Sequence, residues 1–102
     1  MSKIALIGPS QMVLPLASSG IEIFPADSGY EAGLRIEAIS EKNEYAVVFI
    51  TERLAMDCME SIELNQGKIN FVFIPDNQGS VGLFFEKTNK LVKEAIGVSQ
   101  ND

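Results

Sequence analysis

Four short apolar segments alternate with stretches of helical periodicity, and this alternation limits what the chain can fold into more than any other feature does. Each segment is rich in β-branched or aromatic residues and is bounded by Gly, Pro, Asp or Asn, a pattern typical of strands. Three of them are almost continuously apolar, as strands covered on both faces are. The remaining segment contains Glu22 and soon reaches Pro25, which favours an edge strand. We therefore expect strands at 3–8, 21–24, 45–50 and 69–74.

The residues after the second strand carry the signature of a helix start. Ser28 can cap the helix, and the carboxylate of Glu31 can accept a hydrogen bond from the Ser28 amide, as in a capping box. The apolar residues that follow occupy one broad helical face, with charged residues outside it. The face expected in the core is formed by Tyr30, Ala32, Leu34, Ile36, Ala38 and Ile39.

Apolar stripes predict two further helices, and a shorter one is expected between the first two strands. Thr51 is the expected N-cap of the helix after the third strand, and the stripe of that helix assigns Cys58 to the core. Pro15 limits the regularity of the short helix, where Val13, Leu14 and Leu16 are the apolar positions. The stripes are Leu54, Ala55, Cys58, Met59 and Ile62, and then Val81, Phe84, Phe85, Thr88, Leu91, Val92, Ala95 and Ile96, with Gly97 as the terminator.

The resulting order, β-α-β-α-β-α-β-α, predicts right-handed crossovers and a parallel sheet with helices on both faces. The expected fold is a small three-layer, doubly wound α/β domain, Rossmann-like or receiver-like, with a four-stranded parallel sheet and a C-terminal helix. Residues 1–97 are expected to form this single domain, and 98–102 a frayed tail.

The chain lacks the side chains that carry much of the common enzyme chemistry. Its 102 residues include no His and one Cys, which excludes Ser-His and Cys-His couples, imidazole ligands and cysteine zinc clusters. The net charge of −6 is a poor match for a nucleic-acid backbone. We therefore expect no catalytic residue, no cofactor, no metal and no nucleic-acid partner.

The composition also bears on location. The apolar run at 4–7 stops at Gly8-Pro9, too soon for a signal peptide or a membrane span. A single thiol at Cys58 suits a reducing compartment. These features predict a cytoplasmic chain without direct membrane insertion.

The loops that follow the strands lack the motifs of nucleotide or phosphoryl chemistry. Gly8 stands without the further glycines of a dinucleotide fingerprint, and Gly67-Lys68 precedes a strand instead of opening a helix. A receiver domain needs acids after the first strand and an Asp at the end of the third to hold Mg²⁺. Gly8-Pro9 and Ile50-Thr51 occupy those places, so an active receiver is not expected.

The segment after the fourth strand carries the strongest interaction signal. Residues 1–80 hold the whole net charge of −6, whereas 81–102 are neutral overall. Large apolar residues at the start of the last helix exceed what one buried stripe can absorb, and Leu83 shares the outward side with lysines. A plain turn followed by lysines that complement the helix dipole is the alternative. The predicted partner-binding residues are Asn77, Gln78, Val81, Leu83, Phe84, Phe85, Lys87 and Lys90.

A family resemblance begins at 45–52, where an apolar strand runs through Ile-Thr-Glu into a helix. Together with other pieces in order along the chain, this stretch resembles the F subunit of the V-type and A-type rotary ATPases. The sequence departs from the family at Pro9, where members commonly have an acid, and at Leu14-Pro15, where many have Gly-Phe. The other matching pieces are 3–8, 16–21, 73–75, 77–82 and 93–97.

The resemblance implies a non-catalytic component of the central rotor stalk. In that family the domain binds the coiled coil of the D subunit inside the catalytic A/B complex. Rotation of the stalk couples ATP hydrolysis or synthesis to H⁺ or Na⁺ transport through the membrane sector, and the domain can modulate ATPase activity. The expected partners are therefore the coiled-coil D subunit by direct contact, and the A/B complex and the membrane-sector connector indirectly.

Other classes of function stay open at this point. A stand-alone regulatory domain, or a degenerate receiver without phosphorylation chemistry, fits the same pattern of strands and helices. Neighbouring genes for the A, B and D subunits of a rotary ATPase would separate these classes from a rotor component. An enzyme is the third class, and no residue in the sequence is suited to carry its chemistry.

Overall fold

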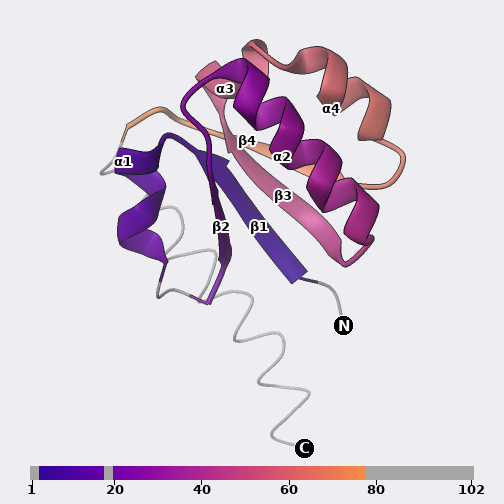
Figure 1. Cartoon of the computed structure of the whole chain (residues 1–102), viewed down its shortest axis with the longest axis horizontal. Coiled ribbons are helices and arrows are strands. Elements are labelled where there is room, and N and C mark those ends of the chain that lie inside the picture. The colour runs from indigo at the N-terminus through magenta and orange to yellow at the C-terminus, as the bar shows by residue number, and fades with distance from the viewer. Residues whose placement is uncertain (1–2, 18–19, 78–102) are drawn as a thin grey trace, which may run out of the picture.

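The computed structural model describes residues 3–17 and 20–77, which build a parallel four-stranded sheet with helices on both faces (Figure 1). The strand order is β2-β1-β3-β4, so β1 and β3 are central and β2 and β4 are edges. This confirms the predicted parallel α/β sheet and the edge position of the second strand. The strands are β1 (Lys3–Gly8), β2 (Glu22–Pro25), β3 (Tyr45–Thr51) and β4 (Asn70–Ile74).

The two central strands are the most deeply buried part of the sheet. Ala5, Leu6 and Ile7 of β1 have no exposed surface, and Val48 and Ile50 of β3 have none either. The strands pair in parallel, with Ala5 opposite Val48 and Ile7 opposite Ile50. Since successive side chains point to opposite faces, both faces of these strands need a cover.

The helices of the described residues supply that cover unequally. One face carries α2 (Gly29–Lys42), α3 (Glu52–Met56) and α4 (Met59–Asn65), which bury the larger apolar core (Figure 1). The other face carries α1 (Ser10–Val13) and the 3₁₀ turn η1 (Leu14–Leu16). Ile4, Ile23, Val47 and Val72 are only partly buried on this second face.

Helix α2 begins and ends as its sequence indicates. The hydroxyl of Ser28 accepts a hydrogen bond from the Glu31 amide (3.1 Å), which confirms the predicted cap. The carboxylate of Glu31 accepts from the amide of Asp27 (2.8 Å), one residue before the one predicted. At the other end Asn43 adopts the left-handed conformation, and its amide donates to the carbonyl of Ser40.

The buried face of α2 is narrower than predicted. Ala32, Ile36 and Ile39 lie in the core as expected. The assignment of Tyr30, Leu34 and Ala38 to the core was wrong, because these three side chains are exposed. Leu34 precedes Ile36 by two residues, which turns it to nearly the opposite side of the helix.

The helix predicted after β3 is interrupted. It forms α3 and α4, with a bend at Asp57-Cys58. The stripe residues Leu54, Ala55, Cys58 and Ile62 are buried as predicted, whereas Met59 is exposed. The bend lies against the first turn of α2, where a Cβ built on Gly29 would come within 2.5 Å of the Asp57 Cβ.

The short helix between β1 and β2 is irregular, as predicted from the presence of Pro15. The α-helical turn ends at Val13, and Pro15 lies in the first turn of η1. Val13 is buried and Leu16 is half-buried, but Leu14 is exposed.

The predicted last helix at 81–96 and the predicted tail at 98–102 lie outside the described residues. Within 3–17 and 20–77, no helix is both long and apolar enough to cross a membrane.

The contact of Gly29 with the α3–α4 bend generates a test. Gly29→Ala should lower the free energy of unfolding by about 1–3 kcal/mol, because the new methyl overlaps the backbone of Asp57. This loss should outweigh the gain that alanine otherwise brings to a helix. Urea unfolding followed by circular dichroism measures it.

Gly67→Ala is the matched control, because a Cβ at Gly67 meets nothing within 4 Å. Its stability should be unchanged or slightly raised. Equal stabilities of the two variants would contradict the close packing described at Gly29.

Candidate functional site

The carboxyl edge of the sheet is the first place to look for a site. From β1 the chain crosses to β2 on one side, and from β3 it crosses to β4 on the other. The loops after β1 and β3 therefore diverge at the switch point, where doubly wound sheets bind their ligands. Gly8-Pro9 and Thr51-Glu52 form this point.

The protein's own side chains close the switch point. A Cβ on Gly8 would lie 2.6 Å from Val13 Cγ1 and 3.2 Å from Thr51 Cγ2. Val13 and Thr51 are both fully buried. The space beside Gly8 that a ligand would occupy is thus filled by a valine from α1 and a threonine from β3.

Two aspartates flank the switch point, and both bind the start of a helix. Asp27 follows β2 and accepts hydrogen bonds from the amide (3.0 Å) and the hydroxyl (2.7 Å) of Ser10, the first residue of α1. These bonds, the one from the hydroxyl first, lower the pKa of Asp27 below its usual value. Asp76 follows β4 and accepts from the amide of Arg53 (2.8 Å) in the first turn of α3. Each carboxylate thus caps the helix that follows the neighbouring strand.

The side chain that caps α3 comes from outside the helix. Thr51 stands at the N-cap position, but its hydroxyl accepts no hydrogen bond from the helix. Its Oγ1 is buried and has no hydrogen-bond partner among the described residues. Thr51 is therefore the N-cap residue, as predicted, but the side-chain hydrogen bond to the first turn of the helix comes from Asp76.

The same edge does not offer the acidic constellation of a receiver. The strand ends carry Gly8-Pro9 and Ile50-Thr51, and both neighbouring aspartates are bonded to amides. Among the described residues, no three His, Cys, Asp or Glu side chains gather into a possible metal site.

The predicted contact segment begins at a shallow depression beside this edge. Its volume is about 390 Å³, and its lining is mainly charged: Glu52, Arg53, Asp57 and Asp76, with Met56. Asn77, the first predicted partner-binding residue, follows Asp76 directly and is exposed. Gln78, Val81, Leu83, Phe84, Phe85, Lys87 and Lys90 lie outside the described residues.

Cys58 lies in the core, as predicted, but not in the middle of a helix. It occupies the N-cap position of α4, at the bend. Burial, followed by the charge of Asp57, raises the pKa of its thiol. A thiol with a raised pKa is a poor nucleophile, in keeping with a core residue.

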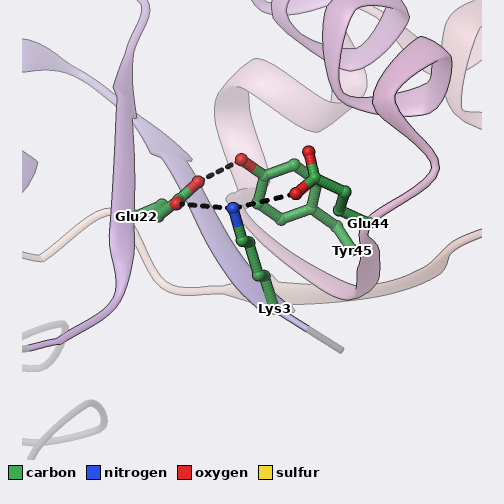
Figure 2. A network of polar contacts seen from close by, with 4 residues as sticks. All are labelled: Lys3, Glu22, Glu44 and Tyr45. Carbon is green, nitrogen blue, oxygen red and sulfur yellow. Dashed lines mark hydrogen bonds and ion pairs between the residues drawn. The ribbon is translucent and has the colours of Figure 1, made fainter. Parts of the chain in front are cut away.

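A polar network joins three strands at the opposite edge of the sheet (Figure 2). The Lys3 ammonium lies 2.9 Å from a carboxylate oxygen of Glu44 and 3.5 Å from one of Glu22. The Tyr45 hydroxyl donates to the other oxygen of Glu22, and its ring packs edge-on against Phe24. Residues of β1, β2 and the start of β3 are thereby tied together.

The pKa values of the network follow from these contacts. Burial and the hydrogen bond to Glu22 raise the pKa of Tyr45 to about 12. The Tyr45 hydroxyl lowers the pKa of Glu22, with a further contribution from the charge of Lys3. The hydrogen bond to Glu44, together with the charges of both carboxylates, raises the pKa of Lys3. All three groups are held in the state that keeps the contacts intact at neutral pH.

One exposed apolar surface was not predicted from the sequence. Tyr30 and Leu34 of α2 lie beside Met56 and Met59 along a groove between α2 and the α3–α4 bend. The stripes had placed Tyr30, Leu34 and Met59 in the core. The sequence signal for this surface was the pair of glycines at i and i+4, Gly29 and Gly33. Without side chains there, α2 can pack closely against the bend, and the larger side chains next to the glycines remain exposed to solvent.

Comparison with known proteins places the chain among proteins of one kind. Residues 4–92 match the family model described as ATP synthase (F/14-kDa) subunit. The F subunit of the V-type ATP synthase from Clostridium botulinum (strain Eklund 17B / Type B) is 33% identical over 99 residues, covering 95% of each chain.

Two further relatives are similar over nearly the whole length of both chains. The F subunit of the V-type ATP synthase from Fusobacterium nucleatum is 35% identical over 99 residues, 95% of this chain and 93% of the relative. The F subunit of the A-type ATP synthase from Methanococcus aeolicus is 28% identical over 97 residues, 94% and 96% of the two chains. The similarity therefore spans the described residues and extends beyond them.

The hydroxyls of Thr51 and Ser28, which both stand at N-cap positions, can be compared directly. Thr51→Val should raise the free energy of unfolding by about 1 kcal/mol, because it removes a buried hydroxyl without a partner and keeps the shape of the side chain. Ser28→Ala should lower it by about 1 kcal/mol, because the hydroxyl there caps α2. Urea unfolding of both variants measures the difference. A loss of stability in Thr51→Val equal to that in Ser28→Ala would show that the Thr51 hydroxyl is satisfied.

The raised pKa of Tyr45 predicts a loss of stability in alkali. The pKa of an unfolded tyrosine is about 10, so the contribution of Tyr45 is complete below pH 10 and is lost as pH rises to about 12. Unfolding of the wild type and of Tyr45→Phe should therefore differ most below pH 10 and converge above it. The difference in ultraviolet absorbance between the two proteins should show the phenolate forming near pH 12. Stability curves of the two proteins that stay parallel up to about pH 12 would contradict the network.

Proposed function

Because the chain belongs to the family of the ATP synthase (F/14-kDa) subunit, we propose that it is a central-stalk component of a V-type or A-type ATPase. The family membership confirms the resemblance found in the sequence. The observation that carries the proposal is the extent of the match, which reaches 95% of this chain and of the Clostridium relative.

The proposed role is non-catalytic. The chain binds the coiled-coil D subunit of the stalk, turns with it, and helps to couple ATP hydrolysis or synthesis to H⁺ or Na⁺ transport. It lies at the cytoplasmic side as a peripheral part of the membrane-bound complex, and it can modulate ATPase activity. The closed switch point at Gly8, Val13 and Thr51 supports this role, because it provides no opening for a nucleotide.

The proposed contact with the coiled coil begins where the chain leaves β4. The hydrogen bond from the Arg53 amide to Asp76 holds the end of β4 against α3. Asn77 therefore leaves the sheet at a fixed place, beside the charged depression at Glu52 and Asp57. From there the contact continues through Gln78, Val81, Leu83, Phe84 and Phe85, with Lys87 and Lys90 facing acidic groups of the partner.

A degenerate receiver without phosphorylation chemistry is the second candidate; the family match favours the rotor component over it, and the carboxyl edge of the sheet argues only against an active receiver. The two aspartates there are held by the amides of Ser10 and Arg53, one strand away from where receiver chemistry needs them. A rotor component needs no such chemistry.

Size-exclusion chromatography with the purified coiled-coil D subunit tests the proposed contact. Phe84→Asp should weaken complex formation at least about tenfold, because it places a charge in an apolar contact. Lys87→Glu should weaken it less, and more strongly at low salt than at high salt. Circular dichroism and thermal unfolding establish that each variant keeps its fold.

Leu64→Asp and Lys42→Glu are the matched controls, since both residues are exposed and lie on α4 and α2. Both should keep full affinity for the coiled coil. Complex formation unchanged in Phe84→Asp and Lys87→Glu would overturn the assigned contact, and absence of any complex with the wild type would overturn the rotor function itself.

A further inference from the structure

An open groove of about 600 Å³ runs between α2 and the α3–α4 bend. Four large apolar side chains line it: Tyr30, Leu34, Met56 and Met59. We call this surface the α2–α4 groove. Asn77, the described residue of the proposed contact with the coiled coil, does not line it, whereas Met56 and Asp57 line both this groove and the depression beside Asn77.

The apolar lining is exposed to a degree that the fold does not require. Tyr30 is 78% exposed, Met56 76%, Leu34 48% and Met59 37%. A single exposed apolar residue is ordinary on a protein surface. Four around one groove mark a surface for recognition.

The shape of the groove follows from glycines on α2. A Cβ on Gly29 would clash with Asp57, and one on Gly33 would lie 3.1 Å from the Ser61 hydroxyl. Helices α2 and α4 therefore approach closely along Gly29 and Gly33, and the larger side chains on either side form the walls of the groove. The exposed lining is thus built into the packing of α2 against α4.

The charges around the groove have one sign. Glu37, Asp57 and Glu60 line it, and among the described residues no lysine or arginine does. An acidic rim around an apolar floor complements a helix with an apolar face and basic flanks. Methionine side chains, which bend easily, adapt to such a face.

We propose that the α2–α4 groove binds a basic amphipathic helix of a partner protein. The apolar anchors of the helix, spaced at i, i+3 or i+4 and i+7, occupy the space between Leu34 and Met56. Its Lys or Arg side chains face Glu37, Asp57 and Glu60. A second copy of the chain is a poorer occupant, because two acidic grooves would meet with like charge.

Fluorescence anisotropy with a labelled synthetic peptide tests the proposal on the full chain. The peptide has about 18 residues, or five helical turns, with Leu on one face and Lys on the other. A second peptide carries Glu in place of Lys. In about 0.15 M salt the Lys peptide should bind at least about tenfold more tightly than the Glu peptide.

Paired variants locate the binding. Met56→Ser should weaken Lys-peptide binding about five- to tenfold, whereas Leu64→Ser, at a residue that is 78% exposed but outside the groove, should leave it unchanged. Glu60→Gln should weaken it about threefold and Glu63→Gln should not, since only Glu60 lines the groove. Phe84→Asp should bind the peptide as the wild type does, which separates this surface from the contact with the coiled coil.

Several outcomes would overturn the proposal. Equal losses in Met56→Ser and Leu64→Ser, or equal binding of the two peptides, would show non-specific adsorption. A self-association, seen in sedimentation equilibrium and lost in Met56→Ser, would assign the groove to a second copy. NMR shift changes at Lys87 and Lys90 caused by Met56→Ser, without peptide binding, would assign it to the chain's own last segment.

Discussion

The parallel pairing of β1 with β3 is the contact on which the rest of the structure depends. Ala5, Leu6 and Ile7 lie beside Val48, Phe49 and Ile50 across the centre of the sheet, with almost no exposure to water. Removing this apolar surface from water is the main source of stability in such a core. Because both faces of the pair are apolar, helices must cover both, and the crossovers to β2 and β4 must leave in opposite directions. The network of Lys3, Glu22, Glu44 and Tyr45 then joins the amino ends of the strands.

The same pairing places Gly8 and Thr51 close together at the carboxyl edge of the sheet. The side chains of the protein itself fill the space between them. In many doubly wound proteins this edge is an opening with acids or glycines ready for a ligand. Here Val13 occupies the opening, and the nearby carboxylates of Asp27 and Asp76 are engaged by helix amides. The two surfaces proposed to bind partners lie elsewhere, at the end of β4 and in the α2–α4 groove.

The strands and the parallel sheet could be predicted because their signals are local. Continuous apolar runs such as 45–50 are bounded by residues that interrupt strands, and the cap at Ser28 can be predicted from the four residues 28–31 alone. The exposed α2–α4 groove could not be predicted in this way. Tyr30 and Leu34 are large apolar residues like those of the core, and the side of α2 that is buried depends on tertiary contacts such as the approach of Gly29 to Asp57. The role of Asp76 at α3 was missed for a related reason, since Asp76 is 23 positions away from Arg53 in the sequence. Of the predicted partner contacts, only Asn77 lies in the described part of the chain, so that assignment stays a prediction.

The two aspartate caps also set an order of events during synthesis. Helix α1 is synthesised before Asp27, and α3 is synthesised before Asp76. Helices of four and five residues have little stability of their own, so each must wait for the acceptor that arrives with the next strand. A chain that stops just before residue 76 therefore contains all of β4 but lacks the acceptor for the first turn of α3. Asp76, two residues after β4, thus completes a helix that precedes it in the sequence.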